Sequence, residues 1–127
     1  MSERNGKDLK VLLVEDFEDT RLFLRLALED HGFIVFEAEN GEKAVENANR
    51  ENPDVILMDL TMPLMDGFAA AKLIRQNEQF KNVPIIAITA HQETDFRSDA
   101  KASGFDAYVT KPIDVHWLKE LIDGLLI

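Results

Sequence analysis

The chain contains no cysteine among its 127 residues. Disulfide bonds, thiol nucleophiles and thiolate metal sites are therefore excluded, and carboxylate oxygens remain as the natural ligands for a metal ion. Such ligands favour a hard cation, so we expect Mg²⁺, with Mn²⁺ as a substitute, rather than Zn²⁺. The length is that of one domain, and we expect a single domain over 1–127 with its core at about 9–126.

Long hydrophobic runs and an excess of positive charge are also missing. No apolar stretch approaches the ~20 residues that span a bilayer, and the opening segment MSERNGKDLK has no apolar core typical of a signal peptide. We therefore expect a soluble, cytoplasmic protein. With 24 acidic against 14 basic residues, the net charge is −10, which opposes binding to nucleic acid and to anionic membranes. Direct contact with nucleic acid or membrane is not expected.

What the chain does have is four short apolar runs, each followed at once by reactive polar residues. A bounded run of this kind is typical of a buried parallel strand, and parallel strands present their carboxyl ends at one edge of a sheet. Three carboxylates, a hydroxyl and an ammonium group are therefore predicted to meet there. The runs are VLLV before Glu15 and Asp16, VILM before Asp59, IIAI before Thr89, and AYV before Thr110 and Lys111.

Segments of helical periodicity separate these runs, so strand and helix alternate along the chain. With a further strand near 34–38, we expect five strand–helix units that form an α/β, doubly wound, five-stranded parallel sheet with five helices on both faces. The fourth helix, 93–103, has few apolar side chains and should be easily displaced. The last helix, about 114–126, has one apolar face that closes the fold.

The first helix is expected to begin with Asp19 or Thr20 at its N-cap. Leu22 and Leu26 lie on one helical line, with Phe23 on the next. This apolar stripe is expected to pack on the sheet.

In a flavodoxin-like strand order, 2-1-3-4-5, the first and third strands are neighbours, and Asp16 faces Asp59 across the crevice between them. Two carboxylates ~4 Å apart repel by about 4 kcal/mol at an effective dielectric of about 20, and Glu15 adds a third charge. The cluster therefore needs a cation. Mg²⁺ is usually held by one or two carboxylates together with waters and phosphate oxygens. We expect Asp16 and Asp59 to bind it directly and Glu15 to act through water.

A carboxylate can also act as a nucleophile and form an aspartyl phosphate, provided that metal and fixed donors neutralise the incoming charge. Asp59 is placed for this attack, because it ends the predicted central strand with Lys111 and Thr89 as donors beside it. Each residue alone has an ordinary explanation as a helix cap, a turn residue or a solvated lysine. Their occurrence at successive strand ends favours a site for phosphoryl transfer.

The chain resembles the receiver domain of two-component response regulators, of the single-domain or hybrid-kinase type, without an output domain. The resemblance covers about Leu9–Leu126 through the segments VLLVED, PDVILMDLTMPLMDG, IIAITA and YVTKP. It implies that a histidine kinase or phosphotransfer protein phosphorylates Asp59 in a Mg²⁺-dependent reaction, and that Thr89 and Lys111 contact the phosphoryl group. It also implies a cis Lys111–Pro112 bond. Such a protein is not an enzyme, beyond catalysing its own phosphorylation from small phosphodonors and its own dephosphorylation.

The resemblance assigns the metal ligands as well. It implies that Mg²⁺ is held by Asp16, Asp59 and the backbone carbonyl of Thr61, and that Glu15 holds a metal-bound water. Receiver domains commonly have Asp at the position of Glu15, where Glu is a familiar variant.

It further implies that Tyr108 is the switch aromatic. We expect Thr89 to move toward the phosphoryl group, Tyr108 to turn inward and the fourth helix to shift. The 89–117 surface, which comprises the fourth helix, fifth strand and fifth helix, would then change for a downstream protein partner. Trp117 lies off the apolar line of the last helix and is expected to anchor that contact.

Three alternatives remain to be weighed. A pseudo-receiver would keep the fold as a docking or dimerisation module without phosphotransfer, but the complete set of site residues argues against it. An aspartate-nucleophile phosphatase would typically have a second Asp two residues after the nucleophile, where this chain has Thr61. A flavodoxin-like redox protein would need a phosphate loop rich in Ser, Thr and Gly after the first strand, and none is present.

Overall fold

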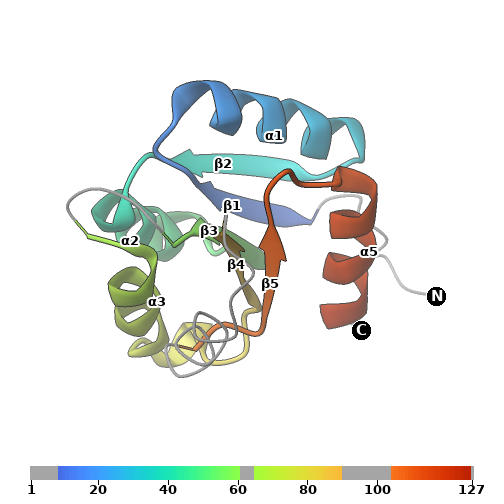
Figure 1. The fold of residues 1–127 in the computed structure, drawn as a ribbon. Coiled ribbons are helices and arrows are strands. Elements are labelled where there is room, and N and C mark those ends of the chain that lie inside the picture. The colour runs from blue at the N-terminus through green and yellow to red at the C-terminus, as the bar shows by residue number, and fades with distance from the viewer. Residues whose placement is uncertain (1–8, 61–64, 90–103, 127) are drawn as a thin grey trace.

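Five parallel strands form a single sheet in the order β2-β1-β3-β4-β5 (Figure 1). The computed structural model describes residues 9–60, 65–89 and 104–126. The predicted doubly wound sheet and its strand order are confirmed. The strands are β1 (Lys10–Val14), β2 (Ile34–Ala38), β3 (Val55–Asp59), β4 (Ile85–Thr89) and β5 (Ala107–Thr110).

Helices cover both faces of the sheet, as predicted (Figure 1). The described residues include four of the five expected α-helices, and the fourth, expected over 93–103, lies outside them. In this part of the chain, no helix is long and apolar enough to cross a membrane. The helices are α1 (Glu18–Asp30), α2 (Gly41–Glu51), α3 (Gly67–Arg75) and α5 (Val115–Leu125), with a short 3₁₀ helix, η1 (Glu78–Phe80).

Two apolar layers hold the helices against the sheet. Leu24 of α1 and Leu118 of α5 belong to the layer on one face, together with Leu57 of β3. Ala70 of α3 and Met58 of β3 belong to the layer on the other. All residues of β3 and β4 are buried, because apolar side chains alternate to both faces. The carboxyl ends of these central strands are therefore fixed points of the fold.

The first helix begins earlier than predicted. It starts at Glu18 with Phe17 at the N-cap, and Phe17 makes no side-chain capping hydrogen bond. The prediction of an N-cap at Asp19 or Thr20 is wrong, because both residues lie within the first turn. An acidic residue in the first turn still interacts favourably with the helix dipole. The acidic residues therefore do mark the start of α1, but from inside the helix and not from its N-cap.

The buried face of α1 also differs from the prediction. Leu24 and Leu28 are the buried residues of this helix. The stripe expected to pack on the sheet instead faces solvent: Leu22 is 45%, Phe23 61% and Leu26 52% exposed. The described residues leave this apolar surface of α1 uncovered.

Two arginines account for the orientation of α1. Arg21 and Arg25 lie on the same side of the helix as Leu24 and Leu28, at the spacing i, i+3, i+4, i+7. Both pair with Glu37 of β2, through Arg21 Nε at 2.9 Å and Arg25 Nη1 at 3.0 Å. The inward stripe is therefore half charged, and a search for apolar periodicity alone misses it.

Candidate functional site

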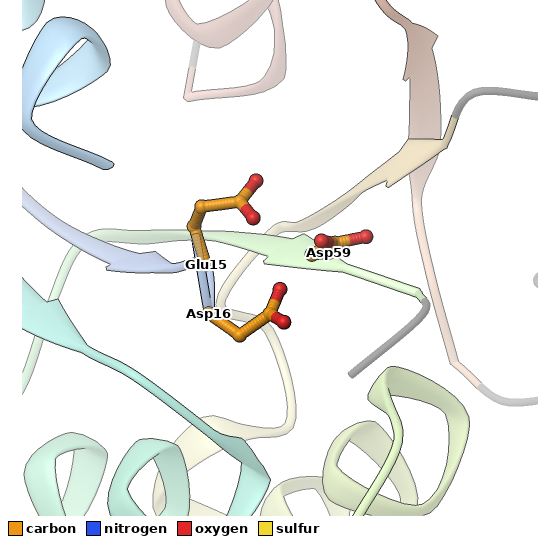
Figure 2. A group of neighbouring side chains, drawn as sticks. All are labelled: Glu15, Asp16 and Asp59. Atoms are coloured by element: carbon orange, nitrogen blue, oxygen red, sulfur yellow. The ribbon is translucent and has the colours of Figure 1, made fainter. Parts of the chain in front are cut away.

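The ends of β1 and β3 bring three carboxylates together. The parallel register pairs Val14 with Met58, so Glu15 and Asp16 follow β1 beside Asp59 at the end of β3. Figure 2 shows the three carboxylates directed into one space. One oxygen from each lies within 4.8 Å of the others. Glu15 and Asp59 are buried and Asp16 is exposed, so the cluster is open to solvent on the side of Asp16.

The ends of β4 and β5 complete the predicted edge. Thr89, the last residue of β4, is buried, and its carbonyl accepts a hydrogen bond from the Lys111 N–H at 2.8 Å. Lys111 Nζ lies 3.4 Å from Glu15 Oε1 and 3.6 Å from Asp59 Oδ2. The Lys111–Pro112 bond is cis, as the resemblance implied. The predicted carboxylates, hydroxyl and ammonium thus occupy one edge of the sheet.

The approach of α3 fixes the backbone around Asp59. The Gly67 N–H donates to the Leu60 carbonyl at 3.2 Å. A Cβ at Gly67 would overlap the Asp59 carbonyl and come within 2.9 Å of the Leu60 Cα. Only glycine allows this contact between helix and strand end. Thr61, predicted to offer its carbonyl to the metal, lies outside the described residues.

The acidic cluster has the chemistry of a hard-cation site. Glu15 Oε2 accepts a hydrogen bond from the Phe17 N–H at 3.1 Å. Glu15 Oε1 is buried, accepts no hydrogen bond from the described residues and lies 3.4 Å from the Lys111 ammonium. Three carboxylates facing one ammonium leave an excess of negative charge, and carboxylate oxygens are the ligands that Mg²⁺ takes in proteins. The residues therefore fit a Mg²⁺-like ion.

Glu15 is the group whose ionisation this cluster perturbs. Burial raises the pKa of Glu15 from 4.5 to about 7, and the negative charge of Asp59 adds to the shift. The Phe17 N–H and the Lys111 ammonium oppose it by favouring the carboxylate. Near neutral pH, the metal-free protein therefore holds Glu15 partly protonated.

This shift predicts a pH dependence of stability. Because folded Glu15 binds its proton more tightly than the unfolded chain does, its contribution is fully present below pH 4.5 and is lost as the pH rises through about 7. We expect the melting temperature of metal-free protein, relative to that of Glu15→Gln, to fall over this range. Thermal unfolding of both proteins in a chelating buffer, at a series of pH values, measures this difference in melting temperature. Parallel profiles for the two proteins would contradict the shift.

Tyr108 and Trp117, the residues of the predicted switch and output surface, lie around one cleft. Tyr108 is half-buried in β5 and packs against the apolar layer shared with α2 and α3. Trp117 on α5 is 50% exposed, as expected from its place off the apolar line. Both line the cleft, together with Pro112 and Ile113. The fourth helix, expected beside Trp117, falls in the undescribed part of the chain.

A second groove runs from the site to α1. It is lined by Thr20, Phe23, Leu24, Lys111, Pro112 and Ile113. Phe23 therefore extends the exposed apolar surface of α1 toward Lys111, whose ammonium contacts Asp59. Apolar periodicity places Phe23 against the sheet, so this continuity could not be predicted from the sequence.

The fold and the edge of the sheet together define a phosphoacceptor signalling domain. Residues 11–123 match the family model of the response regulator receiver domain, and the chain belongs to this family. It is accordingly a signalling switch of two-component systems. Receiver domains are generally not enzymes, and they act with histidine kinases and phosphotransfer proteins. The comparisons favour neither the pseudo-receiver nor the phosphatase.

Individual relatives agree with this assignment. The chain is 37% identical to the protein PilH of Pseudomonas aeruginosa over 118 residues, which covers 92% of this chain and 97% of PilH. The structure of the chemotaxis protein CheY4 of Vibrio cholerae has a TM-score of 0.90 and 31% identity, and covers 94% of this chain and 99% of CheY4. The receiver domain of the sensor histidine kinase PA1611 of P. aeruginosa, solved with magnesium in its active-site cleft, has a TM-score of 0.87 and 32% identity over 94% of this chain and 98% of its own.

Proposed function

We propose that Asp59 accepts the phosphoryl group, from a histidine kinase or a phosphotransfer protein, in a Mg²⁺-dependent reaction. The observation that carries this proposal is the surroundings of Asp59: a buried carboxylate at the centre of the edge, 3.6 Å from the Lys111 ammonium and within the acidic cluster of Glu15 and Asp16. Glu15 and Asp16 follow β1, whose neighbours in the sheet are β2 and β3, whereas Asp59 ends β3, which has β4 on its other side.

Each residue has a distinct part in the transfer. An Asp59 oxygen attacks phosphorus and the bond to the donor breaks, so the donor leaves with the electron pair. Lys111 and Thr89 then provide an ammonium and a hydroxyl to the phosphoryl oxygens. Asp16, Asp59 and the Thr61 carbonyl would hold Mg²⁺, with Glu15 acting through water, and the ion would supply charge neutralisation. The protein itself provides these groups, so a small phosphodonor can replace the donor protein.

The experiment is incubation with acetyl phosphate, followed by intact mass measurement. One phosphoryl group per chain is expected with Mg²⁺ and none after chelation. A chain that stays unmodified at saturating Mg²⁺ is a pseudo-receiver.

We propose further that phosphorylation changes the surface around Trp117 for a downstream protein. Thr89 moves toward the phosphoryl group and Tyr108 turns inward, which reshapes the cleft that Tyr108 and Trp117 line. Trp117 is the only tryptophan, so its fluorescence reports on this cleft alone. We expect its emission to shift on phosphorylation and to stay constant in Asp59→Asn. An emission maximum that does not move in phosphorylated wild-type protein would contradict the switch.

The exposed apolar surface of α1 suits the donor protein. A donor must bring its phosphoryl group to Asp59, and the groove from Phe23 to Lys111 lies beside that residue. We expect Phe23→Asp to slow transfer from a phosphorylated donor protein by about 10-fold, the effect of losing one apolar anchor, without changing the reaction with acetyl phosphate. Leu73→Asp, which places the same charge on the exposed face of α3, is the matched control. Equal rates of transfer from the donor protein to Phe23→Asp and Leu73→Asp would show that the donor does not bind at the apolar surface of α1.

A further inference from the structure

The peptide group between Glu15 and Asp16 is held on its carbonyl side by a side chain from α1. Arg21 Nη1 donates a hydrogen bond to the Glu15 carbonyl at 2.8 Å. The Glu15 N–H donates to the Ala38 carbonyl, at the end of β2, at 3.1 Å. These two hydrogen bonds hold the peptide groups on both sides of the Glu15 Cα, which restrains the backbone dihedrals of Glu15 and so the direction of its side chain. The planar peptide that follows then places the Cα of Asp16.

The guanidinium of Arg21 is itself anchored. Its Nε donates to Glu37 Oε1 at 2.9 Å, and the Arg21 side chain is only 14% exposed. The Glu37 carbonyl accepts a hydrogen bond from Asn47 Nδ2 at 2.8 Å, which holds its backbone. The other carboxylate oxygen of Glu37 pairs with Arg25 Nη1 at 3.0 Å. A planar guanidinium offers donors in a rigid fork, so one side chain can hold Glu37 and the Glu15 carbonyl at the same time.

We infer that Arg21 is a positioning residue for the cation site, orienting Glu15 and Asp16 through the carbonyl between them. The inference rests on the proposed function, because it takes the acidic cluster to be the cation site. The side-chain contacts of Arg21 in the described residues are with Glu37 and with the Glu15 carbonyl. Arg21 acts through the backbone, and its anchor on β2 ties the end of β1 to the neighbouring strand.

If Arg21 acted only through its charge, its removal would have the opposite effect on cation binding. Removing a positive charge near a cation site strengthens cation binding by electrostatics. Arg25 provides a matched control, because it lies on the same helix and pairs with the same Glu37, and the contact recorded for it in the described residues is with Glu37 alone. An electrostatic role therefore predicts tighter binding in both arginine variants, whereas positioning predicts weaker binding in the Arg21 variant only.

The test is Mn²⁺ affinity, measured by the electron paramagnetic resonance signal of the free ion. Arg21→Met, which keeps the aliphatic stem, is expected to weaken affinity by about 10-fold, at the lower end of effects seen for groups that orient metal ligands. Arg25→Met should bind Mn²⁺ as tightly as wild-type protein or more tightly. Arg21→Lys, which keeps the charge and one donor, should recover part of the loss. Thermal unfolding of each variant shows whether it is folded.

Equal affinities for Arg21→Met and Arg25→Met would overturn the inference. If Arg21→Met does not fold, Arg21→Lys decides, and an unchanged affinity there would overturn it as well. Asp16→Asn separates this result from a failure of the proposed function. If wild-type protein binds no Mn²⁺, or if Asp16→Asn binds it unchanged, the cation site itself is wrong and the role of Arg21 falls with it.

Discussion

Asp59→Asn is expected to remain folded and to incorporate no phosphoryl group from acetyl phosphate or from a donor protein. Asparagine keeps the shape of the buried side chain but lacks the carboxylate nucleophile. The substitution also removes the charge that helps to raise the pKa of Glu15. The variant should therefore melt at the same temperature as metal-free wild-type protein or higher, which separates loss of reaction from loss of fold. Intact mass and thermal unfolding measure the two effects.

The matched control for Asp59→Asn is Asp30→Asn, the same change at an exposed residue that ends α1. This control should be phosphorylated like wild-type protein. A mass gain that survives in Asp59→Asn would show that another residue is the acceptor.

Lys111→Met is expected to slow phosphorylation at saturating Mg²⁺ by about 100-fold, the usual effect of removing one fixed donor from developing negative charge. Lys111 is the cation placed between the two buried carboxylates, 3.4 Å from Glu15 and 3.6 Å from Asp59. Its loss should also raise the pKa of Glu15 further, because the ammonium favours the carboxylate. The rate is measured by intact mass against time.

Lys119→Met is the control for this substitution. Lys119 forms an ion pair with Asp123 at 2.7 Å along α5, so the change removes the same charge away from the site. Its rate should equal that of wild-type protein. If Lys111→Met were as fast as this control, Lys111 would have only a structural role.

The strands and the site residues could be predicted from the sequence because both follow local rules. Short apolar runs are typical of buried parallel strands, and parallel strands gather the residues after them at one edge. Glu15, Asp59 and Lys111 meet there as expected. The strand order was taken from the flavodoxin-like arrangement of doubly wound sheets, since the apolar pattern of β1 or β3 does not say which strands are neighbours.

The orientation of α1 could not be predicted in the same way. The inward stripe contains Arg21 and Arg25, whose burial depends on Glu37 in a strand that follows later in the chain. Without this partner, Leu22 and Leu26 are the better candidates for burial. The hydrogen bond from Arg21 to the Glu15 carbonyl could not be predicted either. Every residue has a backbone carbonyl, so the residue type does not indicate which one accepts.

Chemical mapping of the acceptor tests the central claim most directly. Borohydride reduces an aspartyl phosphate to homoserine, so protein treated with acetyl phosphate and Mg²⁺ can be reduced, digested with trypsin and sequenced by mass spectrometry. The tryptic peptide 51–72 contains Asp54, Asp59 and Asp66, which fragmentation distinguishes. Homoserine at position 59, dependent on Mg²⁺, is the predicted result. Homoserine at Asp16 or at another aspartate, with position 59 unchanged, would contradict the account.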